Sequence, residues 1–236
     1  MKENFINVVF VIDESGSMGG TEADVIGGFD KVVNEQKANK KGSCSVSYFK
    51  FASNVEEVFI GKDVNEVGSL EGHYHPGGLT ALFDGVGTAI DKIGKWLNSM
   101  KEEEKPEKTL VVIMTDGGEN DSKEYTASQV KEMIKHQEEK YNWSFVYMGS
   151  DLTNAADANT LGFKTRSFAS KSNYYKNYDV INASVTAYRN AVGDAHVKMC
   201  AFNDVLSLET DNLTEEYAAA TGLDADELKG NKNENA

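Results

Sequence analysis

Cysteine is scarce in this chain, which has only Cys44 and Cys200 among its 236 residues. Two thiols cannot build the disulfide framework of a small secreted domain, and Cys44 lies in an apolar stretch where a buried free thiol is typical. The four histidines and two cysteines also form no cluster at the spacing of a tetrahedral zinc site. The low cysteine content favours a reducing compartment, so we expect a cytoplasmic protein.

Basic residues are outnumbered, with 24 Lys and Arg against 38 Asp and Glu, and the net charge is −14. This balance argues against nucleic acid and anionic lipid as partners, and it favours cations or a basic protein surface. Long apolar runs are lacking too, since none reaches the roughly 20 residues that a membrane-spanning helix needs. The first apolar run ends at Asp13 without a small-residue cleavage site. We therefore expect no membrane partner.

Short apolar runs typical of buried strands alternate with helical patterns along the chain. The expected strands are 7–12, 45–51, 55–60, 110–114, 143–148 and 163–167, and the expected helices are 21–40, 81–100, 129–141, 155–161 and 174–191. This alternation predicts an α/β fold, a doubly wound and mainly parallel sheet with helices on both faces. The strands 45–51 and 55–60 are joined too tightly for a crossover, so they predict one antiparallel edge strand.

The periodic pattern fades after about Leu208. We expect one domain over residues 1–208 and an acidic, flexible tail over residues 209–236, with at most a short helix around "TEEYAAA". This tail carries eight acids and two bases, so it is acidic like the rest of the chain.

Oxygen-bearing side chains follow the predicted strands at three places. Asp13, Ser15 and Ser17 lie in "DESGS" after the first strand, Thr80 ends "GGLT" before a helix, and Asp116 lies in "MTDGGEN" after the strand 110–114. Each stretch alone is typical of a helix cap or a turn. In an open parallel sheet, however, the carboxyl ends of the strands meet at one edge, and glycines let backbones approach closely there. Together the three stretches predict a divalent-metal site.

Asp-x-Ser-x-Ser after a first strand, a Gly-Gly loop with a threonine, and Thr-Asp-Gly after a later strand resemble the metal-ion-dependent adhesion site of von Willebrand factor type A domains. The resemblance covers roughly residues 5–192. It implies five metal-coordinating residues, namely Asp13, Ser15, Ser17, Thr80 and Asp116. The chain departs from the family's usual Gly-Gly-Thr by one extra residue, Leu79.

The donor set suits Mg²⁺, with Mn²⁺ or Ca²⁺ as alternatives, because these hard cations prefer oxygen ligands. Neutral hydroxyls hold the ion without cancelling its charge, so it can still take a carboxylate from another molecule. The resemblance implies this mode of binding, in which a partner Asp or Glu completes the coordination shell. His73, His75, Gly78 and Gly117 lie next to the predicted ligands, and we expect them at the rim of the site.

The function that these observations predict is a metal-dependent protein-binding adaptor and not an enzyme. The chain resembles stand-alone bacterial and phage members of this family, and the resemblance implies an adaptor. Some adaptors of this kind work with AAA+ ATPases. One alternative is a Mg²⁺-dependent hydrolase or phosphotransferase, but Ser15 stands where an aspartyl phosphotransferase needs a second acid, and no G-x-S-x-G occurs. Another alternative is a structural assembly subunit with a stabilising metal.

Overall fold

The computed structural model describes residues 1–150, 152–168, 175–222 and 224–229. Six strands form one sheet: β1 (Lys2–Asp13), β2 (Ser43–Phe51), β3 (Val55–Asp63), β4 (Pro106–Met114), β5 (Ser144–Gly149) and β6 (Thr165–Phe168). Seven helices lie in the described ranges: α1 (Glu22–Ala38), α2 (Leu82–Ser99), α3 (Ala127–Tyr141), α4 (Leu152–Leu161), α5 (Lys176–Asn190), α6 (Ala195–Thr221) and α7 (Ala225–Lys229).

The strands lie in the order β3-β2-β1-β4-β5-β6, and only β2 and β3 pair antiparallel. The predicted doubly wound sheet with one antiparallel edge strand is therefore confirmed. Strand β1 pairs in parallel with both β2 and β4, and its residues from Ile6 to Asp13 are all buried. Residues 8–12 of this stretch form a continuous apolar run, which a central parallel strand needs because helices cover both of its faces.

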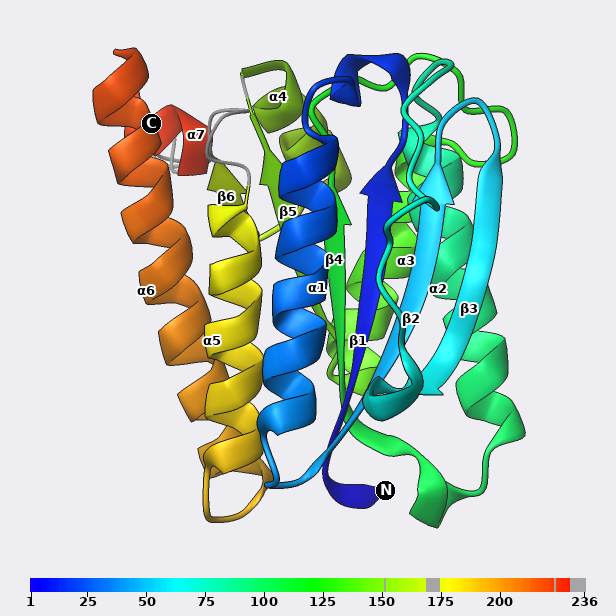
Figure 1. Ribbon diagram of the computed structural model, residues 1–236, viewed down its shortest axis with the longest axis vertical. Helices are drawn as coiled ribbons and strands as arrows, with labels where there is room; N and C mark the ends of the chain where they lie inside the picture. The colour runs from blue at the N-terminus through cyan, green and yellow to red at the C-terminus, as the bar shows by residue number, and fades with distance from the viewer. Residues whose placement is uncertain (151, 169–174, 223, 230–236) are drawn as a thin grey trace.

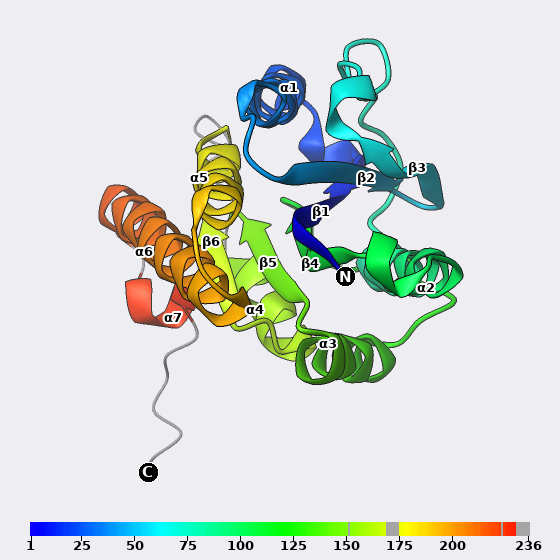
Figure 2. The same cartoon turned by 90° about the horizontal axis from the view of Figure 1, so that it is seen from below.

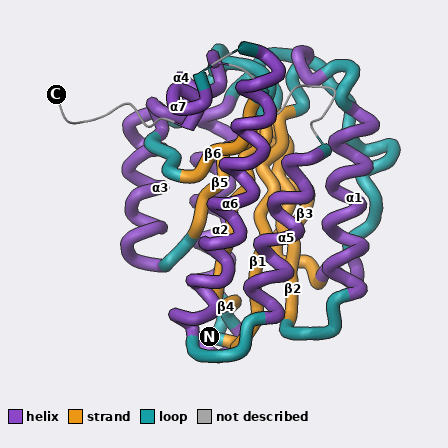
Figure 3. Tube along the Cα trace, turned by 90° about the vertical axis from the view of Figure 1, so that its left-hand side faces the viewer, coloured by secondary structure: helices purple, strands orange, loops and turns teal. Residues whose placement is uncertain are grey.

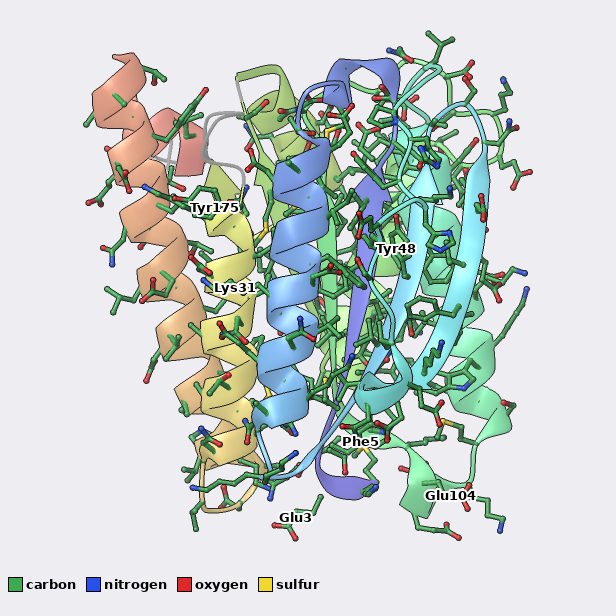
Figure 4. All side chains as sticks on the ribbon, in the orientation of Figure 1. Glu3, Phe5, Lys31, Tyr48, Glu104 and Tyr175 are labelled. Atoms are coloured by element: carbon green, nitrogen blue, oxygen red, sulfur yellow. The ribbon has the colours of Figure 1, made fainter. Side chains whose placement is uncertain are left out.

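Helices α1 and α5 cover one face of the sheet, and α2, α3 and α4 cover the other (Figure 2). The first face buries Phe10 and Tyr48 against Phe29 of α1, with ring centroids 5.1 Å and 5.7 Å apart. Lys31 of α1 points toward α5 and pairs with Asp179 at 2.5 Å (Figure 4). The two faces form separate hydrophobic cores, so the sheet is held between two packed helical layers.

The carboxyl ends of the parallel strands all lie at the upper end of the molecule in Figure 1, opposite the N-terminus. The chain crosses to one face after β1 and to the other face after β3, so β1 and β4 are the strands at which the winding reverses. Ligands bind in α/β sheets at this reversal point, just beyond the strand ends.

The boundary expected at residue 208 is wrong, because it falls inside the 27-residue helix α6. This helix runs beside α5 along the β6 edge of the sheet (Figure 3). It buries a stripe at three- and four-residue steps: Lys198, Phe202, Leu206, Thr210, Leu213, Thr214, Tyr217 and Ala218. The threonines and the lysine in this stripe hide the apolar periodicity in the sequence. Residue 223 and the last seven residues of the predicted tail lie outside the described residues.

Helix α7 adds to this edge by burying Leu228 with Ala155, Tyr217 and Ala218. None of the helices in the described ranges has both the length and the apolar character that crossing a membrane demands.

Contact between α1 and α5 depends on Gly28, since a methyl group on its α-carbon would lie 2.1 Å from the fully buried ring of Tyr178. We predict that Gly28→Ala lowers the free energy of unfolding by about 1–3 kcal/mol through overpacking. Gly27→Ala is the matched control, because nothing lies within 4 Å of its added methyl group. The free energy of unfolding of Gly27→Ala should rise by about 0.5–1 kcal/mol, because alanine has a higher helix propensity than glycine. Urea denaturation measures both, and equal effects of the two substitutions would contradict this packing.

Candidate metal centre

Three chain segments meet beyond the carboxyl ends of β1 and β4. The first is the turn after β1, in which Asp13 ends the strand and a short 3-10 helix spans Gly16–Met18. The second is the loop that leads into α2, and the third is the loop that follows β4. Strand pairing sets two of these segments side by side, because Ile12 of β1 pairs with Met114 of β4.

The hydroxyls of Ser15, Ser17 and Thr80 gather around the point that a β-carbon at position 117 would occupy. A methyl group on the Gly117 α-carbon would lie 2.8 Å from Ser17 Oγ, 2.9 Å from Thr80 Oγ1 and 3.6 Å from Ser15 Oγ. The two serine oxygens are themselves 3.0 Å apart. Three hydroxyls from two distant segments therefore converge on one small space, and only a glycine at position 117 leaves that space open. We name Ser15, Ser17 and Thr80 the hydroxyl cluster.

Asp13 lies fully buried directly beside this cluster. Its Oδ1 accepts a hydrogen bond from the Ser15 amide at 2.7 Å, and its Oδ2 accepts one from Thr115 Oγ1 at 2.6 Å. Burial raises the pKa of Asp13 to about 6, although these hydrogen bonds oppose the rise, and the nearby charge of Asp116 adds to it. A bound cation would offset this cost of burying a carboxylate.

Asp116 lies next to Gly117 in the loop after β4, and it is only 6% exposed. The structure thus brings all five sequence-predicted ligand residues to one end of the sheet: three hydroxyls around a common point and two buried carboxylates at its side. The donors are all oxygen atoms, and this chemistry fits a hard cation such as Mg²⁺ better than zinc. Among the described residues, no three His, Cys, Asp or Glu side chains gather into a metal-binding group, so a cation here would need the hydroxyls.

Two backbone hydrogen bonds join the loop that carries Thr80 to the turn after β1. Gly16 donates its amide to the Gly78 carbonyl at 3.1 Å, and Gly77 donates to the Glu14 carbonyl at 2.7 Å. Gly78 has a φ of +83°, a backbone conformation that favours glycine. Gly78, expected at the rim, therefore serves as a backbone contact that joins this loop to the serine turn.

Three side chains that the sequence did not mark tie the loop after β4 to α2 and to the Thr80 loop before it. Asp84 of α2 accepts hydrogen bonds from the amides of residues 123, 124 and 125 at 2.8–2.9 Å. In return, Glu119 accepts one from the Phe83 amide at 3.0 Å. Asn120 Oδ1 accepts from the Thr80 amide at 2.8 Å. The Thr80 loop and the Asp116 loop thus behave as one unit.

Two further supporting residues approach from the β4 and α4 side. Thr115 orients Asp13, and its hydroxyl also accepts from the Gly117 amide at 3.2 Å. Asn154 of α4, fully buried, donates from Nδ2 to the Gly117 carbonyl at 3.0 Å. The sequence could have indicated Thr115, because it places a hydroxyl next to Asp116 at the end of a strand. Asn154 gives no such signal, because only the packing of α4 brings it to Gly117.

The two histidines expected at the rim make other contacts. The imidazole of His75 hydrogen-bonds the Gly72 carbonyl at 3.0 Å, and its amide donates to Glu14 Oε1 at 2.5 Å. His73 lines a separate cavity of about 260 Å³ together with Tyr48 and Leu70. Gly117 lies directly beside the hydroxyl cluster.

Solved structures of other proteins are similar to the fold of this chain. The chain is similar to proximal thread matrix protein 1 of the mussel byssus, with 16% identity and a TM-score of 0.53 over 77% of this chain and 47% of that one. It is similar to a von Willebrand factor type A protein of Catenulispora acidiphila, with 14% identity and a TM-score of 0.53 over 79% and 43%. The chain thus spans less than half the length of these two proteins.

A third similar structure is the vWF domain of the type V pili tip protein Mfa5 from Porphyromonas gingivalis. The identity is 10% and the TM-score 0.59, over 81% of this chain and 98% of that domain. No curated protein matches this chain in sequence. The model of the von Willebrand factor type A domain matches residues 7–187, which is most of the chain and includes all five predicted ligand residues. The chain therefore belongs to the von Willebrand factor type A domain family.

Proposed function

We propose that this protein is a protein-interaction module whose binding site is completed by a divalent cation. The observation that carries the proposal is the convergence of Ser15, Ser17 and Thr80 around Gly117, with Asp13 and Asp116 buried beside them. Mg²⁺ is the cation that we propose, since it prefers six oxygen ligands and keeps some of its water. Ser15, Ser17 and Thr80 would hold it through neutral oxygens, and the two aspartates would supply the negative charge.

Such an ion would remain able to attract an anionic ligand, because three of its protein donors are neutral and do not cancel its charge. A carboxylate from a partner protein, an Asp or a Glu, is the ligand that suits an exchangeable position on Mg²⁺. The similar domains of a pilus tip protein and of a byssal thread matrix protein support a role in protein assembly. An AAA+ ATPase as the partner and a cytoplasmic location stay predictions from the sequence.

We propose binding and not catalysis at this site. Both carboxylate oxygens of Asp13 already accept hydrogen bonds, from the Ser15 amide and the Thr115 hydroxyl, and the side chain is fully buried. A nucleophilic aspartate needs an oxygen that can reach a substrate, so this environment favours a supporting role for Asp13.

Metal binding should be visible as a gain in stability. We predict that Mg²⁺ at a hundred times its Kd raises the free energy of unfolding by about 2.7 kcal/mol relative to the chelator-treated protein. Ser17→Ala and Thr80→Ala each remove one hydroxyl of the cluster and should reduce this gain. Thermal unfolding in MgCl₂ and in EDTA measures it. An unchanged melting temperature of the parent protein in Mg²⁺, with Mn²⁺ and Ca²⁺ equally without effect, would contradict a metal site.

Thr115 should tune the affinity for the metal without touching it. Thr115→Val keeps the shape of the side chain but removes the hydrogen bond to Asp13 Oδ2, so we predict a Mg²⁺ affinity roughly 10–100-fold lower. The matched control is Thr109→Val, a buried threonine earlier in β4. Isothermal titration calorimetry of both variants measures the difference, and equal affinities of the two would refute the role of Thr115.

A further inference from the structure

Leu79 is a large apolar side chain in an exposed position beside the hydroxyl cluster. It immediately precedes Thr80, and it is 52% exposed. The other large apolar side chains exposed in the described ranges lie elsewhere in the fold: Met1, Val58, Tyr141, Tyr175, Val192, Val197 and Leu208. Leu79 is also the residue by which this chain departs from the Gly-Gly-Thr pattern. A single exposed leucine is common on protein surfaces, so its position needs a further argument.

The backbone on both sides of Leu79 is held by hydrogen bonds to other segments. Its own amide donates to Ser53 Oγ at 3.0 Å, and the next amide, that of Thr80, donates to Asn120 Oδ1 at 2.8 Å. The amide of Ala81 donates to the Ala52 carbonyl at 2.9 Å. The leucine therefore lies on a fixed loop, and the β2–β3 turn and the loop after β4 hold that loop in place. Because the backbone of this loop is already fixed, a partner that covers Leu79 does not have to order it.

We infer that the partner has an apolar residue two positions from its coordinating Asp or Glu, and that this residue packs on Leu79. The inference rests on the proposed function, because the cation and the carboxylate set where the partner chain lies. Leu79 and Thr80 are consecutive, so their α-carbons are about 3.8 Å apart. A partner chain in extended conformation advances about 3.3 Å per residue and turns successive side chains to opposite faces. The residue two positions from the acid therefore lies on the same face as the acid, about 6.6 Å away, and it is the one that can reach a leucine adjacent to a metal ligand.

Leu79 is thus a specificity-determining residue, and the partner motif is an acid with an apolar residue two positions away. The metal would bind any accessible carboxylate, whereas contact with Leu79 selects among them. The high acidity of the chain adds a preference for motifs without further acids, because its net charge of −14 repels them.

A peptide library with one fixed central Asp and random neighbours tests the inference. The library is displayed on phage, selected on the full chain in MgCl₂ and eluted with EDTA. We expect Leu, Ile, Val, Met or Phe to be enriched two positions from the fixed Asp. Selected peptides are then synthesised, labelled and titrated against the parent protein and two variants. Leu79→Ser should weaken binding by about fivefold, the effect of exposing part of a leucine side chain.

Leu208→Ser is the matched control, since this leucine is 58% exposed but lies on α6. Its affinity for the same peptides should stay within about twofold of the parent. The stabilisation by Mg²⁺ should be unchanged in both variants, which shows that the loop and the hydroxyl cluster remain intact. Loss of this stabilisation in Leu79→Ser would overturn the assignment of Leu79 to specificity.

The outcomes separate this inference from the proposed function. Asp-containing peptides that bind only with Mg²⁺ but show no apolar preference would overturn the role of Leu79 and leave the metal-dependent capture of carboxylates standing. A library that yields no Mg²⁺-dependent peptide would overturn both. Equal affinities of the parent protein and Leu79→Ser for an enriched peptide would also overturn the inference, because the apolar residue would then contact another part of the surface.

Discussion

The parallel pairing of β1 with β4 is the constraint on which the whole site depends. It aligns Ile12 with Met114, so the residues that follow, Asp13 and Thr115, emerge side by side and join through a hydrogen bond of 2.6 Å. Because these strands lie where the winding of the sheet reverses, the loops that follow them lead to opposite faces, and ligands in α/β sheets bind between such loops. The other residues of the site gather where these two loops meet.

Carboxylates organise the surrounding loops from within the protein. Asp84 accepts three backbone amides of the loop after β4, and Glu119 accepts the Phe83 amide in return. Buried backbone amides need acceptors, and a charged acceptor makes stronger hydrogen bonds than a neutral one. These two side chains allow a loop without regular secondary structure to hold Asp116 and Gly117 in place. The large acidic excess of the sequence is therefore only partly a surface property.

Helix α6 shows how a buried stripe can escape notice in a sequence. Its inward face contains Lys198, Thr210 and Thr214 among the apolar residues. A threonine inside a helix can satisfy its hydroxyl within that helix, as Thr210 does by donating to the Leu206 carbonyl at 2.8 Å. Lys198 is buried next to Glu3 and Glu107, each 3.3 Å away. Polar residues with such local or paired partners can be buried, but hydrophobic periodicity does not reveal them.

The sequence by itself determined the alternation of strands and helices, the antiparallel edge strand and the strand ends that carry Asp13, Ser15, Ser17 and Asp116, since these follow from short-range periodicity and turn chemistry. Tertiary structure decided what depends on contacts between distant segments. It brought the hydroxyl cluster against Gly117, brought Asn154 to the Gly117 carbonyl and extended the folded chain through α6. A local pattern fixes where a side chain stands along its own element, whereas its neighbours across the fold are set by packing.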